Sequence, residues 1–335
     1  MAEIRRDLVK NNWVGIVADM ALKPHEFPIN KWGIETTSNN NFCPFCEGHE
    51  EFTPPEIMAI RHGDSEANAS GWSIRVIPNK FSVLHLDGIL EKKHNGIYSN
   101  YNGLGRQEVI LETPLHGVDL HEYDKERIMM IIKVLKQRYN ILSQDDRIKY
   151  IQMYKNRGIF AGASQEHSHS QVMGLPFVPQ ENSGLIDYYH KNGSCLLCDI
   201  IRQEKLARER LVYETEHFLL ICPYASRFPY ETWVIPKEHC EHFGAISEAE
   251  INELAMICKK YTCAMIDCLQ NPAYNYMLNS APINVPYIPG FHWYLEITPR
   301  LLVTAGVDIA TGIYMNPVAP ELSAQLFRNY MLGQD

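Results

Sequence analysis

The chain has 335 residues, 45% of them hydrophobic, and a formal net charge of −9. This length allows two domains, or one large sheet in two halves, each with its own hydrophobic core. The acidic balance and the lack of any Lys/Arg-rich run exclude a basic surface that could follow a phosphate backbone, so we expect no nucleic-acid partner.

The N-terminal segment contains no apolar stretch of signal-peptide length, and the most apolar run, residues 127–139, is interrupted by Lys133 and Lys136. We therefore expect a cytoplasmic protein with no membrane partner. The sequence has nine cysteines, which is an odd number. Without a secretory signal, the C-x-x-C pairs among them indicate a metal site rather than a disulfide framework.

The first half of the chain contains one C-x-x-C pair and, further on, two separated histidines. Cys43 and Cys46 form the pair, His116 ends an apolar run, and His167 follows later. Between the two histidines, Asp124 is a typical N-cap before the helical pattern of residues 125–142.

The motif EHSHSQ, residues 166–171, alternates two histidines and a glutamine with two serines. In a strand, this period of two directs the histidines and the glutamine to one face and the serines to the other. The apolar run 172–179, which ends at a proline, supports a strand. A face of this composition is suited to metal binding or catalysis, and the alternative is a polar edge strand with exposed histidines.

The second half repeats this order. Cys195 and Cys198 form a C-x-x-C pair, and His239 and His292 follow at similar intervals. After His239, a capping box that starts at Ser247 predicts a helix before the next strand. His242 lies close to His239 in the sequence and is an alternative to it as a ligand.

This self-similarity predicts an α+β fold made of a duplicated unit, with antiparallel sheets that can join and are flanked by helices. The predicted halves are residues 1–180, with the EHSHSQ motif, and residues 181–335.

Two thiolates from a C-x-x-C turn and two imidazoles from distant strands form the tetrahedral set that zinc prefers, with no position left for water. Such a site is structural. We therefore expect two Zn²⁺ ions per chain. The first set is Cys43, Cys46, His116 and His167, and the second is Cys195, Cys198, His239 and His292. The alternative is that these cysteines are buried apolar residues and these histidines are hydrogen-bonded polar groups.

Several segments resemble the galactose-1-phosphate uridylyltransferase family of the histidine-triad superfamily. They are residues 43–56, 76–84, 155–171 and 292–302. The resemblance extends over nearly the whole chain and is strongest to the ADP-glucose phosphorylase branch, which also carries the motif HSHSQ. It implies a duplicated histidine-triad-like fold with two zinc sites.

The resemblance also implies roles for individual residues. His169 is the expected nucleophile and His167 a zinc ligand. A neutral imidazole can attack an α-phosphorus without prior deprotonation, and the resulting nucleotidyl-histidine can react with a second phosphate. Gln171 and Ser164 are expected to donate hydrogen bonds to the non-bridging phosphate oxygens.

Asn79 and Asn156 match family positions near the nucleotide and its phosphates. Ordinary turn chemistry is the alternative explanation for both asparagines.

The sequence departs from the family pattern in three places. Met20 and Lys23 stand where the family usually has two arginines, Thr311-Gly312 replaces a hexose-binding Tyr-Glu pair, and Glu296 and Thr298 replace histidines of a second metal site in some relatives. These departures leave the hexose open, whereas the residues for nucleotidyl transfer are present.

We therefore expect a nucleotidyltransferase that moves UMP or AMP between a nucleotide sugar and a sugar-1-phosphate or phosphate. One alternative is an ADP-sugar phosphorylase or a histidine-triad nucleotide hydrolase. Another is a non-catalytic, zinc-stabilised binding module. A homodimer is compatible with the sequence.

Overall fold

The computed structural model describes residues 3–17, 21–27, 42–61 and 63–333. Its centre is a ten-stranded sheet in which every neighbouring pair of strands is antiparallel. In spatial order the strands are β10 (Leu211–Glu214), β11 (Phe218–Ile221), β12 (Thr232–Pro236), β14 (Tyr294–Pro299), β13 (Tyr274–Asn279), β8 (Tyr150–Arg157), β9 (His169–Leu175), β7 (Arg106–Leu111), β4 (Trp72–Pro78) and β3 (Met58–Arg61).

The sheet is built from two similar halves. Each half begins, at the outer edge of the sheet, with a four-residue strand, and its two cluster histidines lie in segments that follow or precede inner strands. A long helix follows the first of these histidines: α2 (Lys125–Leu142) in one half and α5 (Glu248–Leu269) in the other. The halves join where β8 pairs antiparallel with β13, from Tyr274 opposite Arg157 to Leu278 opposite Met153. The predicted α+β class, the duplication and the flanking helices are confirmed, and the two sheets form one.

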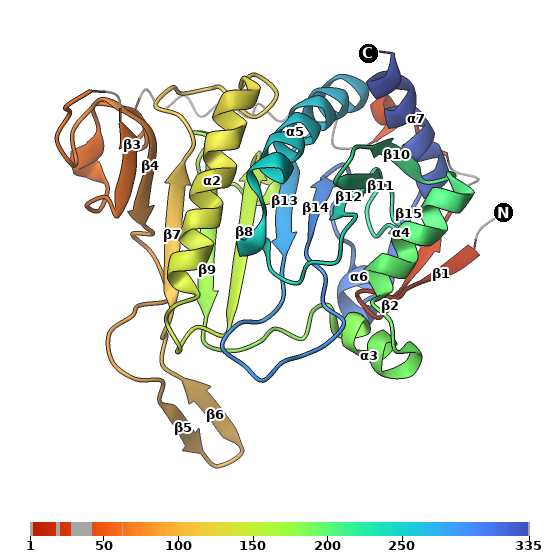
Figure 1. Cartoon of the computed structure of the whole chain (residues 1–335), viewed down its shortest axis with the longest axis horizontal. Coiled ribbons are helices and arrows are strands. Elements are labelled where there is room, and N and C mark those ends of the chain that lie inside the picture. The colour runs from red at the N-terminus through yellow and green to blue at the C-terminus, as the bar shows by residue number, and fades with distance from the viewer. Residues whose placement is uncertain (1–2, 18–20, 28–41, 62, 334–335) are drawn as a thin grey trace.

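The predicted helix starts are also confirmed. The Asp124 side chain accepts a hydrogen bond from the Arg127 backbone N–H at the start of α2. At the start of α5, Ser247 and Glu250 form the reciprocal capping box. Figure 1 shows α2 and α5 side by side across the middle of the sheet.

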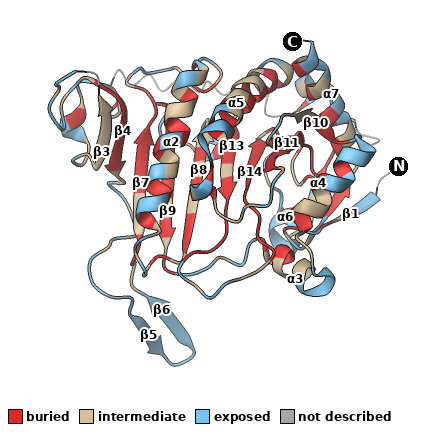
Figure 2. Cartoon of the chain, viewed as in Figure 1, coloured by how far each residue is buried: buried red, intermediate tan, exposed pale blue. Residues whose placement is uncertain are grey.

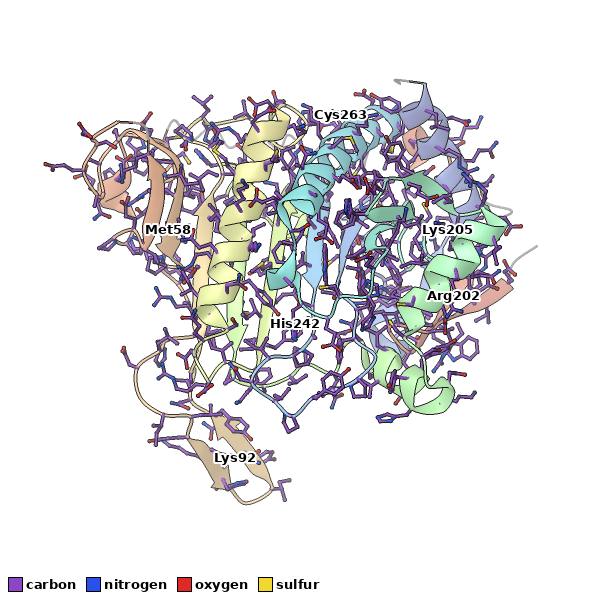
Figure 3. All side chains as sticks on the ribbon, viewed as in Figure 1. Met58, Lys92, Arg202, Lys205, His242 and Cys263 are labelled. Carbon is purple, nitrogen blue, oxygen red and sulfur yellow. The ribbon has the colours of Figure 1, made fainter. Side chains whose placement is uncertain are left out.

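The remaining elements surround this sheet. They are a three-stranded sheet of β1 (Glu3–Asp7), β2 (Asn12–Ile16) and β15 (Tyr314–Asn316), a hairpin of β5 (Lys92–Asn95) and β6 (Tyr98–Tyr101), and the helices α3 (Ser183–Asn192), α4 (Leu196–Ala207), α6 (Gly306–Thr311) and α7 (Pro320–Leu332). Short 3₁₀ helices are η1 (Pro24–Glu26), η2 (Glu50–Phe52), η3 (Ile159–Ala161) and η4 (Phe243–Ala245). Lys92 marks the exposed hairpin, which projects from the body of the molecule (Figures 1 and 3).

The two faces of the sheet are covered unequally. One large apolar cluster lies beneath α2, α5 and α7, and a second cluster, which includes Trp233 and Tyr294, covers the opposite face in the second half. All six residues of β14 are therefore buried, whereas β9 alternates between buried and half-buried positions after its first two residues (Figure 2). This leaves one face of β8 and β9 partly accessible.

Strand β9 begins later than the sequence pattern predicts. The alternation predicts a strand through the whole EHSHSQ motif, but regular pairing starts at His169, opposite Leu111. The alternation nevertheless extends back to His167. The backbone carbonyl of Ser168 still accepts a hydrogen bond from the Glu112 backbone N–H, at 3.3 Å, so the segment remains paired one residue before the strand. The strand ends at Leu175, immediately before Pro176, which has no N–H for the ladder.

No helix in the described part of the chain combines the length and the apolar character needed to cross a membrane.

Candidate active site and two Cys2His2 clusters

The first cluster brings together all four residues of the predicted N-terminal zinc set. Cys46 Sγ lies 3.6 Å from Nδ1 of both His116 and His167, and Cys43 Sγ lies 3.8 Å from His167 Nδ1. The C-x-x-C turn is closed by the Cys46 N–H, which donates to the Cys43 carbonyl. His49 Nδ1 donates to the same carbonyl at 2.7 Å.

The second cluster has the same geometry. Cys198 Sγ lies 3.6 Å from Nδ1 of both His239 and His292, and Cys195 Sγ lies 3.8 Å from His292 Nδ1. The cluster contains His239 and not His242. His242 Nδ1 instead lies 3.1 Å from the Tyr139 hydroxyl.

These distances fit tetrahedral zinc. Zn–S bonds of about 2.3 Å and Zn–N bonds of about 2.0–2.1 Å place a sulfur and a nitrogen on one ion about 3.6 Å apart. In each cluster the four ligand atoms lie within 4.8 Å of one another. Two thiolates and two imidazoles also fill all four positions, so an ion held here has no site for a substrate or a nucleophilic water.

The two clusters differ outside the ligand atoms. His167 Nε2 donates to the Thr113 carbonyl at 2.7 Å, which leaves Nδ1 as the lone-pair nitrogen that faces the thiols. Burial, with a smaller contribution from His116, lowers the pKa of His167 to about 4, so the imidazole is neutral, as metal binding requires. The corresponding atom of the second cluster, His292 Nε2, is buried without a partner among the described residues.

His169 lies two residues beyond His167, at the start of β9, and is 5% exposed. Its Nδ1 donates to the His167 carbonyl at 2.8 Å, so the lone pair of the neutral ring is on Nε2. Burial is the main cause that lowers the pKa of His169, and Lys155 also lowers it. The ring therefore carries an unprotonated nitrogen at neutral pH, and the Phe45 ring packs edge-on against it at 5.5 Å between centroids.

Gln171 follows on the same face of β9, and its carbonyl oxygen is held by neighbouring strands. The Tyr154 hydroxyl donates to Gln171 Oε1 at 3.0 Å, Gln107 Nε2 donates at 3.1 Å, and Asn79 Nδ2 lies 3.5 Å away. With the oxygen occupied, the amide NH2 of Gln171 is the group that can donate to a ligand. Asn79 also closes a local turn, because its Oδ1 accepts from the Phe81 N–H.

Asn156 lies near the end of β8, and Ser164 lies in the loop between β8 and β9. Asn275 Nδ2, on β13, donates at 2.8 Å to Asn156 Oδ1 and at 2.8 Å to the Ala161 carbonyl. Asn275 thus connects the strand that carries Asn156 to the loop that leads to Ser164, which is exposed. The described structure places Asn79 beside Gln171, whereas it gives no contact between Ser164 and His169.

The second half has no histidine and glutamine at the equivalent positions. Two and four residues after the buried cluster histidine, where the first half has His169 and Gln171, the second half has Tyr294 and Glu296. Lys10 Nζ reaches this position, 3.4 Å from Glu296 Oε2, and Arg227 forms a second ion pair with Glu296. Glu296 therefore forms two ion pairs, one of them with a lysine of the turn between β1 and β2.

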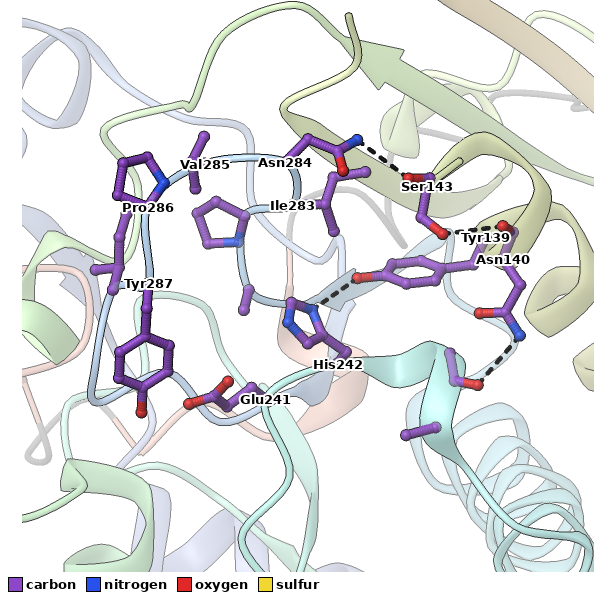
Figure 4. A pocket seen from close by; sticks show the side chains of 15 residues that line it. Tyr139, Asn140, Ser143, Glu241, His242, Ile283, Asn284, Val285, Pro286 and Tyr287 are labelled. Atoms are coloured by element: carbon purple, nitrogen blue, oxygen red, sulfur yellow. Dashed lines mark hydrogen bonds between the residues drawn. The ribbon is translucent and has the colours of Figure 1, made fainter. Parts of the chain in front are cut away.

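A cavity of about 620 Å³ lies elsewhere, between the end of α2 and the loop before β14 (Figure 4). Its polar groups are largely used within the chain. Asn284 Nδ2 donates to three backbone carbonyls, Asn140 Nδ2 donates to the Gly244 carbonyl, and Tyr139 contacts His242 and Ser280. We therefore locate the candidate site at His169 rather than in this cavity.

Sequence reasoning missed the residues that orient Gln171 and connect the loop, namely Tyr154, Gln107 and Asn275. They lie on other strands and reach the site through the register of pairing, in which Tyr154 is opposite Gln171 and Asn275 opposite Asn156. A period-two pattern gives the face of a residue but not its partner across the sheet.

The structure describes most of the residues that depart from the family pattern. Met20 lies outside the described residues. Lys23 is exposed before η1. Thr311 and Gly312 form the C-terminal end of α6, where Gly312 has a φ of 69°.

Comparison with known proteins agrees with this arrangement. Residues 58–179 match the family described as galactose-1-phosphate uridyl transferase, N-terminal domain, and residues 181–303 match its C-terminal domain. ADP-glucose phosphorylase of Arabidopsis thaliana is 35% identical and galactose-1-phosphate uridylyltransferase of Thermotoga maritima is 29% identical. The first alignment covers 98% of this chain and 93% of the relative, and the second covers 98% of each.

The crystal structure of an ADP-glucose phosphorylase from Arabidopsis thaliana with bound ADP-glucose has a TM-score of 0.79 to this chain at 33% identity. The structural alignment covers 98% of this chain and 99% of the Arabidopsis chain. Since the two family domains together span most of the sequence, the chain belongs to the galactose-1-phosphate uridyl transferase family.

Proposed function

We propose that the protein is a nucleotidyltransferase in which His169 Nε2 attacks the α-phosphorus of a nucleotide sugar. The new N–P bond forms as the bond from the α-phosphorus to the bridging oxygen breaks, and the sugar-1-phosphate leaves. A second phosphate-bearing molecule then attacks the nucleotidyl-histidine, takes the nucleoside monophosphate and returns the imidazole to its neutral state. The observation that carries this proposal is the hydrogen bond from His169 Nδ1 to the His167 carbonyl, because it leaves the lone pair on Nε2.

The other site residues supply donors and alignment in this proposal. Phosphoryl transfer requires mainly positioning and stabilisation of charge on the non-bridging oxygens. The amide NH2 of Gln171 and the exposed hydroxyl of Ser164 are the proposed donors to these oxygens. Asn79 and Asn156 are proposed to contact the nucleotide and its phosphates.

Zinc has a structural role in the proposal. Bound by the first cluster, it would fix His167 and so the carbonyl that orients His169. Bound by the second cluster, it would fix His292 just before β14. Since both sets are closed, the reacting groups are the imidazole and the substrate phosphates, not the metal.

We propose that the donor is an ADP-sugar and the acceptor is phosphate. The relative at 35% identity is named ADP-glucose phosphorylase, and the similar structure at 33% identity contains ADP-glucose. Thr311-Gly312, at the place of the expected hexose-binding pair, also supports a substrate outside the galactose pattern. Transfer of UMP to galactose-1-phosphate is the second candidate, because the matching family domains carry that description.

A substrate screen tests the proposal. Purified protein is mixed with ADP-glucose or UDP-glucose, each with phosphate, with galactose-1-phosphate or with neither. We expect phosphate-dependent conversion of ADP-glucose to ADP and glucose-1-phosphate. Faster exchange between UDP-glucose and galactose-1-phosphate would support the second candidate, release of a nucleoside monophosphate without an acceptor would indicate a hydrolase, and no turnover would indicate a binding module.

A further inference from the structure

The serines of the EHSHSQ motif are on the face of β9 opposite His169, and both bind one carboxylate. Ser170 Oγ donates to Glu112 Oε1, and Ser168 Oγ donates to Glu112 Oε2 at 2.8 Å. Glu112 follows β7 and is 1% exposed. Its two oxygens therefore hold the residues immediately before and after His169.

Glu112 is itself fixed by a buried lysine on the other neighbouring strand. Lys155 Nζ, on β8, lies 2.8 Å from Glu112 Oε2, 2.6 Å from Ser168 Oγ and 3.1 Å from Asp119 Oδ1. Asp119 also pairs with Arg157 at 3.2 Å. The two carboxylates and two cations balance in charge, so the group is paired and not a vacant ion-binding site.

This network cannot reach a substrate on the His169 face. Lys155 is 4% exposed and Ser170 is 5% exposed, and both side chains lie on the α2 side of the sheet. Any effect on the reaction must therefore pass through β9. The shortest path runs through Ser168, because the peptide between His167 and Ser168 carries the carbonyl that accepts from His169 Nδ1.

We infer that Glu112 and Lys155 are positioning residues that, through Ser168 and Ser170, hold the His167 carbonyl and keep the proton of His169 on Nδ1. The inference rests on the proposed function of His169. We call these four residues, Glu112, Lys155, Ser168 and Ser170, the clamp. Without the clamp, the His169 ring can rotate or carry its proton on Nε2, where the lone pair is needed. Since a displacement of about 1 Å can reduce a rate about 100-fold, we expect a large effect on the chemical step.

The test removes both hydroxyls while the buried ion pairs stay in place. In Ser168→Ala/Ser170→Ala, we expect the rate of nucleotidyl-histidine formation in a single turnover to fall roughly 10- to 100-fold. The KM for the nucleotide sugar should change less than about threefold, because the substrate side of β9 is unaltered. Zinc content should stay at the wild-type value, since His167 keeps its bond to the Thr113 carbonyl.

Two matched variants accompany it. Ser226→Ala/Ser323→Ala also deletes two buried hydroxyls, whose hydrogen bonds go to the carbonyls of Pro223 and Ala319 in the second half. It should lose similar thermal stability and keep the wild-type rate. Ser168→Ala/Ser170→Thr returns one hydroxyl near Glu112 and should recover part of the lost rate, since a strand tolerates a β-branched residue.

A readout independent of turnover is the tautomer of His169, measured by NMR of protein labelled with ¹⁵N-histidine and assigned with His169→Ala. We expect a single Nδ1–H form in the wild type and a signal from the Nε2–H form in Ser168→Ala/Ser170→Ala. An unchanged tautomer or an unchanged rate would overturn the inference, as would parallel loss of rate and zinc. If the wild type forms no adduct with any nucleotide sugar, the proposed function is wrong, and the tautomer comparison alone decides whether the clamp exists.

Discussion

At the scale of single residues, two side-chain orientations define the chemistry of the site. The His169 ring is oriented by the backbone of its own strand, through the His167 carbonyl. The Gln171 amide is oriented by side chains of neighbouring strands, through its carbonyl oxygen. One residue therefore offers an acceptor nitrogen and the next on that face offers a donor, a combination suited to attack on a phosphate.

Replacing Gln171 should slow the reaction without preventing binding. For Gln171→Ala we expect a loss of about 2–4 kcal/mol in transition-state stabilisation, measured as a 10²- to 10³-fold fall in kcat. Tyr154→Phe removes only one bond that orients the amide, so we expect a smaller loss of about 0.5–1.5 kcal/mol. Gln152→Ala is the control, because that amide donates to the Met153 and Leu278 carbonyls. Near-normal kcat in Gln171→Ala would exclude it as a donor to the transferring group.

The sequence predicted the faces of these residues but not their partners. Alternation in EHSHSQ separates the histidines and glutamine from the serines, and the structure has that separation. That Glu112 binds both serines could not be predicted, because the contact depends on β7 pairing with β9 in one register. The same applies to Tyr154 and Gln171.

At the scale of elements, each Cys2His2 cluster joins a C-x-x-C turn to the segment just before a strand. The first cluster precedes β9, which carries His169, and the second precedes β14, which carries no equivalent residue. A closed zinc site contributes directly to the free energy of folding. The clusters should therefore resemble each other in stability and differ in their effect on activity.

Substitution of one cysteine in each cluster separates these two effects. We expect Cys43→Ser and Cys195→Ser each to release close to one zinc ion and to lower the melting temperature. The fall in kcat should be at least about tenfold greater for Cys43→Ser, because the first cluster supports the strand that carries His169. Loss of groups that orient a metal site typically lowers activity about 10- to 100-fold. Elemental analysis, thermal melts and initial rates provide the comparison. Equal loss of activity in both variants would show that the first cluster has no special connection to His169.

The spacing of cysteines and histidines was the most informative pattern at this scale. It predicted two clusters and a helix after each middle histidine, and both features are present. The choice between His239 and His242 could not be made from spacing, because both follow β12 closely. The fold decides it, since His242 faces Tyr139.

At the scale of the whole molecule, the duplicated halves share one sheet and one main apolar cluster. Strands β8 and β13 pair across the boundary, and the cluster includes Ile132 of α2 and Ala255 of α5. The halves therefore cannot separate without breaking the ladder and exposing apolar surface. The sequence indicated the duplication and allowed the two sheets to join. It did not specify that they join through β8 and β13, because that pairing depends on the fold.

We expect the zinc-loaded chain to unfold in a single cooperative transition. Scanning calorimetry should give a van't Hoff enthalpy close to the calorimetric enthalpy. A strong chelator should move the transition to lower temperature, because metal binds the folded state. Two well-separated transitions in the metal-loaded protein would show that the halves are energetically independent.

Mass spectrometry of the intact protein can detect the proposed covalent bond between His169 and a nucleoside monophosphate. A phosphoramidate is labile in acid, so the protein is mixed with ADP-glucose or UDP-glucose and kept at neutral to alkaline pH. We predict an added mass of AMP or UMP on the wild type, mapped to His169, and none on His169→Ala, whose zinc content stays normal. His167→Ala should lose zinc and most of the adduct together. An adduct mapped to His167, or normal turnover by His169→Ala, would rule out His169 as the nucleophile.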